Sequence, residues 1–243
     1  MFTYPASEIA LFERRGLTCY RGLPVERRRV AVASDTLDMI ALKDAAALLD
    51  DAEFVRECEK TDRLPYGLEL WPAALMLAEH LYLSEPGQGR RAIELGCGVG
   101  LVSIAAARTG WHILATDCDP VPLQFAEFNA AANVVQIQAF QLLDWHKPQT
   151  DARFSRVLAA DVLYQRCDHH PILKCVDQLL ECDGLAVIAD PRRGVADDFG
   201  CLAEAHGFRV NVLPAAASLD DQTPVAGRLF VLQRGRNLLD LDR

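Results

Sequence analysis

The sequence lacks any apolar run long enough to cross a membrane. No such run occurs in the 243 residues, whereas a spanning helix needs about 20 consecutive apolar residues. Residues 1–15 have no apolar core and carry Glu8 and Glu13, which does not fit a secretory signal peptide. With 51% apolar and 24% charged residues, we expect a cytoplasmic globular protein built on one large α/β domain.

Paired cysteine spacing is also absent. The eight cysteines are spread without a C-x-x-C pair, so reduced and mostly buried thiols are expected. One cluster runs from Cys167 through two histidines to Cys175 and Cys182, the last two on one face of a helix predicted over 169–181. It has no ligand doublet with zinc spacing, and we therefore expect no metal site.

Positive charge is scarce. There are 25 Lys and Arg residues against 34 Asp and Glu residues, a formal net charge of −9, which argues against general nucleic-acid binding. Arginines nevertheless concentrate near the N-terminus, at Arg14, Arg15, Arg21, Arg27, Arg28 and Arg29. Such a run usually forms the solvated face of a hairpin; a docking surface for an acidic partner is the alternative.

A ligand-binding turn is indicated by the glycines that are present. An apolar strand pattern containing Glu94 ends in Gly96, Gly98 and Gly100 and passes directly into an Ala-rich run over 101–107. This pattern predicts a buried strand, a tight turn and a helix. Glycine permits positive φ and a close approach of ligand to main chain, and the helix start offers unpaired N–H groups.

The glycine spacing discriminates between nucleotide ligands. A dinucleotide site requires a third glycine where this chain has Leu101, and a P-loop requires a Lys-Ser or Lys-Thr pair that is missing. The spacing E-x-G-x-G-x-G resembles motif I of the class I S-adenosylmethionine (SAM) methyltransferases, whose cofactor has no pyrophosphate. A glycine turn that only packs helix on strand is the alternative.

A carboxylate follows at a suitable distance. The apolar segment 111–116 ends at Asp117, 21 positions after Gly96, about where an α/β nucleotide site places the acid that binds the ribose. Since a hydrogen bond to a charged acceptor contributes about 1.5–3 kcal/mol, we expect Asp117 to affect cofactor affinity rather than chemistry. A helix-capping role falls better on Asp119, which directly precedes Pro120.

Two aromatic positions carry a further resemblance. Trp71 and Pro72 open an amphipathic helix directly ahead of the glycine motif. A Trp-Pro-Ala-Ala helix at this place resembles the seven-β-strand protein-lysine methyltransferases, the branch that includes the electron-transfer-flavoprotein β-subunit enzyme. The resemblance implies that Trp71 lies by the SAM site; an ordinary core tryptophan is the alternative.

Asp144 and Trp145 follow a strand predicted over 137–143. They resemble the family position at which a carboxylate meets the adenine amino group. An adenine needs a hydrogen-bond acceptor for its amino group and flat apolar surface on its faces, and these two residues have those chemistries. A loop aspartate that caps a turn is the alternative for Asp144.

Asp161 and Tyr164 follow a nearly continuous apolar strand over 154–160. Burial on both faces is predicted, with Asp161 at the carboxyl end, beside the glycine turn if the two strands are neighbours. Asp-x-x-Tyr resembles the (D/E)-x-x-(Y/F) motif of the same branch, in place of the Asn-Pro-Pro-Tyr of amide and adenine methylases. The resemblance implies that Tyr164 lines the acceptor channel and that Asp161 positions the cofactor or the incoming amine. A capping Asp161 and a core Tyr164 are the alternative.

Alternating patterns complete the predicted fold. Helices are expected over 120–133, 169–181 and 195–206, and strands over 184–190, 208–213 and 228–233, the last two without a helix between them. This order resembles a Rossmann-like, doubly wound, mostly parallel α/β sheet with an antiparallel edge strand. It spans 64–235, after an N-terminal extension over 1–63, with a β element over 17–40 and a helix, and before a tail over 236–243.

These features predict a SAM-dependent methyltransferase. The resemblance favours transfer to a protein nitrogen, a lysine side chain, by direct in-line displacement. Methyl transfer needs alignment and exclusion of water rather than a covalent protein nucleophile. Two alternatives stay open: a small-molecule N- or O-methyltransferase, and a non-catalytic SAM-binding protein.

Overall fold

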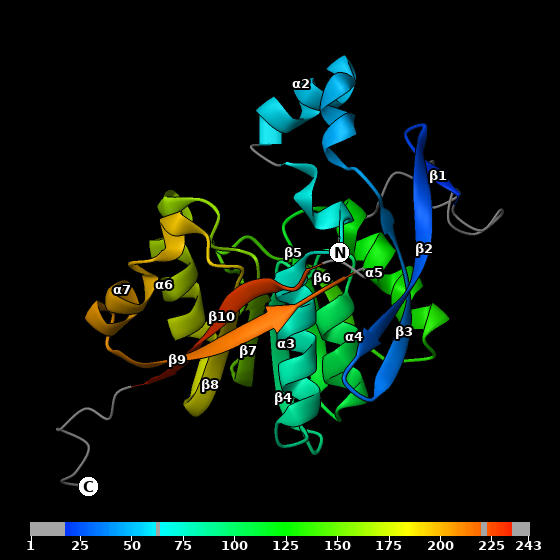
Figure 1. The fold of residues 1–243 in the computed structure, drawn as a ribbon. Helices are drawn as coiled ribbons and strands as arrows, with labels where there is room; N and C mark the ends of the chain where they lie inside the picture. Colours follow the sequence, from blue (N-terminus) through cyan, green and yellow to red (C-terminus); the bar gives the residue numbers. More distant parts are fainter. Residues whose placement is uncertain (1–17, 62–63, 220–222, 235–243) are drawn as a thin grey trace, which may run out of the picture.

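Seven strands form the main sheet, with helices on both faces (Figure 1). The computed structural model describes residues 18–61, 64–219 and 223–234. The strand order is β6-β5-β4-β7-β8-β10-β9. The strands are β4 (Arg91–Leu95), β5 (His112–Asp117), β6 (Ala139–Leu142), β7 (Phe154–Ala160), β8 (Leu180–Asp190), β9 (Phe208–Ala217) and β10 (Val225–Arg234). The first five pair in parallel, whereas β10 pairs antiparallel with both β8 and β9. The predicted mostly parallel sheet with an antiparallel strand on one side is confirmed, but that strand, β10, lies between β8 and the edge strand β9 and is not itself the edge.

The direction in which strands are added reverses at β4. The chain passes from β4 to β5 and β6 on one side and then returns to β7 and β8 on the other. Leu95 of β4 lies opposite Thr116 of β5 and Ala159 of β7, so the three strands end at one level. In open α/β sheets ligands bind in the crevice at such a point. As expected, β4 and β7 are neighbours, which brings Asp161 to the level of the glycine turn.

Two hydrophobic clusters lie on opposite faces of the sheet. The helices are α3 (Pro72–Leu83), α4 (Leu101–Arg108), α5 (Pro120–Ala132), α6 (His169–Leu179) and α7 (Phe199–Ala205). One cluster joins α3, α4 and α5 to the N-terminal strands, and the other joins α6 and α7 to β7 and β8. As predicted, Asp119 caps α5 by accepting a 2.9 Å hydrogen bond from the Val121 amide. Among the residues that the structure describes, no helix has the length and apolar character to cross a membrane.

Three elements on the C-terminal side have bounds that differ from the predicted ones. The helix expected over 169–181 ends at Leu179, and β8 begins at Leu180 instead of 184. The strand reaches further back because Phe154 pairs with Leu180 across a register irregularity. Cys182 therefore lies in a strand and does not share a helix face with Cys175. The helix expected over 195–206 is a 3-10 turn, η4 (Gly194–Ala196), followed by α7.

The N-terminal extension contains a separate antiparallel sheet. Its strands are β1 (Cys19–Tyr20), β2 (Leu23–Val32) and β3 (Asp35–Leu42), and η1 (Ala46–Asp50), α2 (Ala52–Thr61) and η2 (Pro65–Leu68) follow. The turn between β1 and β2 lies at Arg21 and Gly22, which both have positive φ. Pro24 is not part of this turn but belongs to β2. In the arginine run, the Arg28 guanidinium lies 2.9 Å from the Glu26 carboxylate on the same strand. Arg14 and Arg15 lie outside the described residues.

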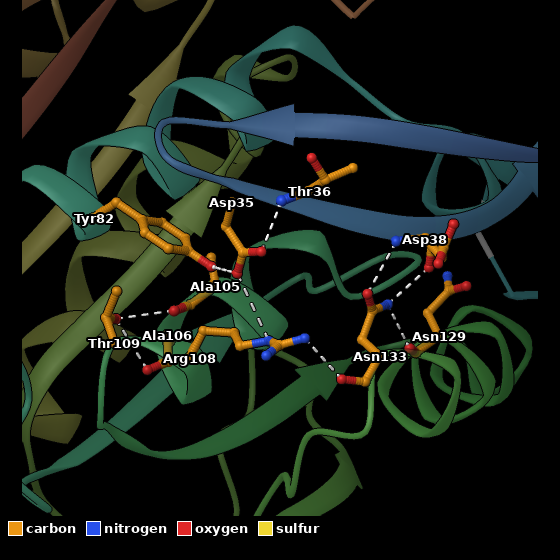
Figure 2. Close-up of polar contacts among 10 residues, drawn as sticks. All are labelled: Asp35, Thr36, Asp38, Tyr82, Ala105, Ala106, Arg108, Thr109, Asn129 and Asn133. Atoms are coloured by element: carbon orange, nitrogen blue, oxygen red, sulfur yellow. Dashed lines mark hydrogen bonds and ion pairs between the residues drawn. The ribbon is translucent and has the colours of Figure 1, made fainter.

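Asn129 of α5 and Asn133, the residue that caps the C-terminus of this helix, bind the backbone of β3 as a neighbouring strand would. Asn129 accepts a 2.8 Å hydrogen bond from the Ile40 amide and donates 3.0 Å and 2.8 Å bonds to the carbonyls of Ile40 and Val99. Asn133 does the same with both backbone groups of Asp38, at 2.9 Å and 2.7 Å (Figure 2). Because residues four apart share a helix face, the two amides match alternate residues of the strand.

A second set of polar contacts fixes the start of β3. The Tyr82 hydroxyl of α3 donates a 2.6 Å hydrogen bond to Asp35, and the Arg108 guanidinium of α4 lies 3.8 Å from the same carboxylate (Figure 2). Arg108 also donates to the Asn133 carbonyl at 2.9 Å. Three helices of the main domain therefore hold the N-terminal sheet.

We expect Asn129→Ala to lower the free energy of unfolding by at least about 2 kcal/mol, because it leaves buried backbone groups of Ile40 and Val99 without partners. Urea unfolding followed by circular dichroism measures this. Asn211→Ala, at an exposed position on β9, is the matched control, with an expected change within about 0.5 kcal/mol. Equal effects of the two substitutions would contradict the role given to Asn129.

Candidate functional site

A cavity of about 450 Å³ lies at the carboxyl ends of the central strands. Its volume falls within the range of small-molecule sites, about 300–1,000 Å³. Seven of the predicted site residues line it: Trp71, Gly96, Asp117, Asp144, Trp145, Asp161 and Tyr164. The other three, Glu94, Gly98 and Gly100, are not among its lining residues. The structure thus gathers most of the predicted site in one crevice.

Bare main chain at the glycine turn forms one wall of this cavity. Gly96 has φ of 67°, and a Cβ atom built on it would lie 3.2 Å from Val162 and 3.5 Å from the Trp145 ring. Gly100 has φ of 90° and caps α4; a Cβ there would lie 2.8 Å from Ala126 Cβ. Gly96 therefore leaves room beside the indole, and Gly100 allows α4 and α5 to pack closely.

Asp117 ties the end of β5 to the glycine turn. Its Oδ2 accepts a 3.0 Å hydrogen bond from the Gly98 amide, and its Oδ1 accepts one of the same length from Asp119. The side chain lines the cavity and is buried, with 7% of its residue surface exposed. Burial raises the pKa of Asp117 to about 6, since a low-dielectric environment disfavours the charged form. The carboxylate is thus held at the position predicted for a ribose ligand.

Glu94 lies behind the turn. Its carboxyl is fully buried and accepts a hydrogen bond from the Ser103 hydroxyl of α4. The Thr116 hydroxyl donates to the Glu94 carbonyl. Burial raises the pKa of Glu94 to about 8, so the neutral acid is favoured at neutral pH. The structure therefore places Glu94 as a support that joins β4 to α4 and does not bring it to the cavity surface.

Asp144 and Trp145 border the cavity on the β6 side. Asp144 is exposed, and its Oδ1 accepts a 2.8 Å hydrogen bond from the His146 amide, so it also makes the capped turn that was the alternative expectation. The Trp145 ring packs beside Gly96, and its Nε1 is buried without a hydrogen-bond partner. A buried donor without a partner costs free energy, which a ligand with an acceptor atom there would recover.

Asp161 follows β7 in a left-handed backbone conformation, with φ of 57°. This region is uncommon for residues other than glycine and often marks a functional site. Its amide donates a 2.9 Å hydrogen bond to Ala189. Oδ1 accepts a 2.6 Å hydrogen bond from Nε of Arg193, whereas Oδ2 is buried without a partner. The carboxylate thus keeps one oxygen for a ligand.

Three aromatic rings line the same cavity as this carboxylate. The Tyr66 ring meets those of Tyr164 and Trp71 edge to face, with centroids 5.5 Å and 6.1 Å away. Trp71 Nε1 donates a 2.7 Å hydrogen bond to the Tyr66 carbonyl, and the Arg193 guanidinium lies 5.7 Å from the Trp71 ring. Burial raises the pKa of Tyr164 well above its ordinary value, so the ring remains neutral. Such walls suit an aliphatic chain that carries an amine.

Two residues that contact the predicted site residues were not themselves predicted: Tyr66, which lines the cavity, and Arg193, which pairs with Asp161. Tyr66 stands five residues before Trp71, in the run that carries the tryptophan motif, and Arg193 ends the Asp-Pro-Arg-Arg run after β8. Both motifs are visible in the sequence. Their contacts with Tyr164 and Asp161 are not, because these depend on how η2 and the loop after β8 pack near the end of β7.

In the part of the chain that the structure describes, no group of three or more His, Cys, Asp or Glu side chains could hold a metal ion. The expectation of mostly buried thiols is wrong, because only Cys97 and Cys175 of the eight cysteines are buried. Within the cluster considered from the sequence, Cys167 and Cys182 are exposed. These residues do not line the cavity.

Comparison with known proteins identifies relatives of the chain. A family model described as lysine methyltransferase matches residues 52–199. The chain is 34% identical over 133 residues to the protein-lysine methyltransferase METTL21E of Bos taurus, covering 49% of this chain and 43% of that protein. It is 30% identical over 146 residues to the protein N-lysine methyltransferase METTL21A of Danio rerio, covering 56% and 65%. The match thus spans less than two thirds of either relative.

Solved structures share the fold. A TehB-like SAM-dependent methyltransferase from Corynebacterium glutamicum superposes with a TM-score of 0.52 at 20% identity, covering 78% of this chain and 98% of that one. At this identity the likeness concerns the fold. The predicted Rossmann-like methyltransferase fold and family resemblance are confirmed, and SAM is the methyl donor that they imply.

We expect Asp117→Ala to weaken SAM binding by about 10-fold to 100-fold, the value of one or two charged hydrogen bonds to ribose hydroxyls. Isothermal titration calorimetry measures it. Because the pKa of Asp117 is raised to about 6, wild-type affinity should also fall as the pH drops below about 6, where the carboxyl becomes protonated. Asp183→Ala, at an exposed position, is the control. Unchanged affinity in Asp117→Ala would show that the ribose assignment is wrong.

We expect Glu94→Gln to remove part of the pH dependence of stability. A carboxyl whose pKa rises from 4.5 to about 8 on folding stabilises the fold fully below the unfolded value, and this contribution is lost as the pH rises toward 8. The wild type should therefore lose stability relative to Glu94→Gln between about pH 5 and pH 8. Urea unfolding at several pH values tests this, and parallel curves for the two proteins would contradict it.

Proposed function

Because this chain belongs to the lysine methyltransferase family, we propose that it transfers a methyl group from SAM to a lysine side chain of a protein substrate. The two relatives described above are protein-lysine enzymes by name. Their names support a protein acceptor for this chain over a small molecule. A cytoplasmic location and the absence of general nucleic-acid binding stay predictions from the sequence, as do the domain boundaries.

The residues of the crevice fit SAM. Gly96 presents bare main chain to the cavity, and Asp117 lies where ribose hydroxyls would donate to it. Asp144 and Trp145 supply a carboxylate and a flat ring for adenine, and the unpartnered Trp145 Nε1 offers a donor. When bound, SAM supplies an electrophilic methyl group on a positively charged sulfur.

The observation that carries the proposal is the unpartnered oxygen of Asp161 within an aromatic enclosure. Asp161 has 8% of its surface exposed, and its Oδ2 is buried without a partner. Tyr66, Trp71 and Tyr164 line the same cavity. A lysine side chain has the complementary parts: an aliphatic stem for the rings and an amine whose N–H groups suit a carboxylate.

These residues would align the amine. A hydrogen bond from the lysine Nζ to Oδ2 of Asp161 fixes its direction, and the tyrosine and tryptophan rings exclude water from its stem. Holding the nucleophile in a near-attack position supplies much of the rate enhancement in a reaction between two bound groups. No serine or cysteine nucleophile is needed.

We expect the protein, incubated with methyl-labelled SAM and a lysate of its source organism, to label protein. Acid hydrolysis of the labelled fraction should yield methyl-lysine. Asp161→Ala and Tyr164→Ala should each reduce labelling at least about 100-fold while calorimetry still detects SAM binding, because both residues are placed at the acceptor. Tyr164→Phe, which keeps the ring, is the matched control and should retain most activity.

Each other outcome selects an alternative. Label confined to the small-molecule fraction would indicate a metabolite methyltransferase, and SAM binding without any turnover would indicate a non-catalytic binding protein. Recovery of methyl-arginine or methyl-histidine would support a protein substrate but would show that lysine is not the methylated residue.

A further inference from the structure

Arg193 makes contacts of the kind expected of the acceptor lysine. Its guanidinium donates the 2.6 Å hydrogen bond to Oδ1 of Asp161 and lies 5.7 Å from the centre of the Trp71 ring. A carboxylate and an aromatic face are the two partners that a lysine ammonium would seek in this crevice. Arg193 does not line the cavity itself, but it places a permanent cation on the far side of the carboxylate that does.

The backbone of Arg193 is held in place from behind. The Asp190 carboxylate accepts a 3.4 Å hydrogen bond from the Arg193 amide and a 2.9 Å one from Nε of Arg228. Arg228 in turn donates to the Arg193 carbonyl at 3.3 Å and lies 3.0 Å from the Asp197 carboxylate. Asp190 has no exposed surface. The guanidinium is thus positioned by a fixed loop, as a preorganised site requires.

The charge balance at Asp161 has a chemical consequence. A lysine can accept a methyl group only when Nζ has an unshared electron pair, so it must first release one proton to solvent. The Nζ–C bond then forms as the C–S bond breaks, and the electron pair of that bond passes to sulfur. A lone carboxylate beside Nζ would stabilise the ammonium and oppose this proton loss. A carboxylate whose charge is balanced by a guanidinium would stabilise the ammonium less and so would not oppose the proton loss.

We propose that Arg193 is a positioning residue that keeps the acceptor amine neutral: it neutralises Asp161, so that Oδ2 accepts a hydrogen bond from an uncharged lysine Nζ. This inference rests on the proposed function. Pairing with Asp161 also raises the pKa of the Arg193 guanidinium, so the cation persists over the whole pH range of an assay.

Other titratable and charged groups face the same space. The cavity is lined by Asp117, Cys118 and Asp119 after β5, by Asp144, His146 and Lys147 after β6, by Tyr164 and Asp168 after β7, and by Tyr66 of η2. Behind Arg193 lie Asp190, Asp197 and Arg228. All of these side chains are present in both proteins, so a difference between two pH profiles reports the loss of the Arg193 charge, acting directly on the amine or through the groups that interact with Arg193.

The test uses Arg193→Met, which removes the charge and keeps a long side chain, and Arg193→Lys, which keeps the charge. Labelling of lysate protein with methyl-labelled SAM is measured against pH for the full chain. In Arg193→Met the acidic limb of the rate profile should move up by about one pH unit, as expected on loss of a neighbouring charge. The rate at neutral pH should then fall about 10-fold and recover at higher pH.

A separate readout distinguishes this effect from damage to the structure. Arg193→Met should bind SAM as the wild type does by calorimetry. The most strongly labelled protein of the lysate is isolated and used as the substrate. With it, the kcat of Arg193→Met at neutral pH should fall without a rise in KM, since the unpaired Asp161 carboxylate binds the lysine ammonium more tightly. In Arg193→Lys the acidic limb of the pH–rate profile should stay at its wild-type position. Arg192→Met, at the exposed neighbouring position, is the control and should leave all of these values unchanged.

An unshifted limb in Arg193→Met, with SAM binding intact, would overturn the inference and leave the proposed function standing. The same conclusion follows if Arg193→Met and Arg193→Lys lose activity equally at every pH, because the role is then structural. A wild-type protein that labels no lysine would overturn the proposed function and, with it, this inference.

Discussion

Parallel pairing of β4 with both β5 and β7 is the constraint on which the site depends. Because Leu95 lies opposite Thr116 and Ala159, the residues that follow these strands emerge at one edge. The hydrogen bond from the Gly98 amide to Asp117 then joins two of the strand ends. A shift of one residue in either ladder would turn the acidic side chains to other faces of the sheet.

Glu94, Asp117 and Asp161 are buried carboxyl groups near this edge of the sheet. Each has different hydrogen-bond and charge partners, and these environments separate their roles. Glu94 lies away from the cavity and is favoured as the neutral acid, so it supports the fold. Asp117 accepts two backbone hydrogen bonds that stabilise its charge. Asp161 is paired with a guanidinium on one oxygen and keeps the other for a ligand. Only the last arrangement combines a paired charge with an unpartnered oxygen, which is what the proposed acceptor amine requires.

The parts of the site that local sequence could predict are those defined by chain neighbours. The glycine turn, Asp117 after a short strand, and the Asp119 cap each depend on a few consecutive residues. Glu94 shows the limit of such reasoning: it belongs to the motif, yet alternation along β4 points its side chain toward Ser103. Arg193 and Tyr66 lie 32 and 95 positions from Asp161, and only the packing of η2 and the loop after β8 brings them there.

The asparagines of α5 could not have been found from sequence patterns either, since an amide on a helix usually indicates a solvated face. Their pairing with β3 connects the N-terminal sheet to the site. The helix that presents Asn129 and Asn133 to β3 begins beside Asp119, and Pro122 in its first turn lines the cavity. The sheet begins ahead of the segment matched by the family model, residues 52–199. β3 thus holds the C-terminal end of a helix whose N-terminal end lines the cavity, and the sheet can stabilise that wall without touching a ligand.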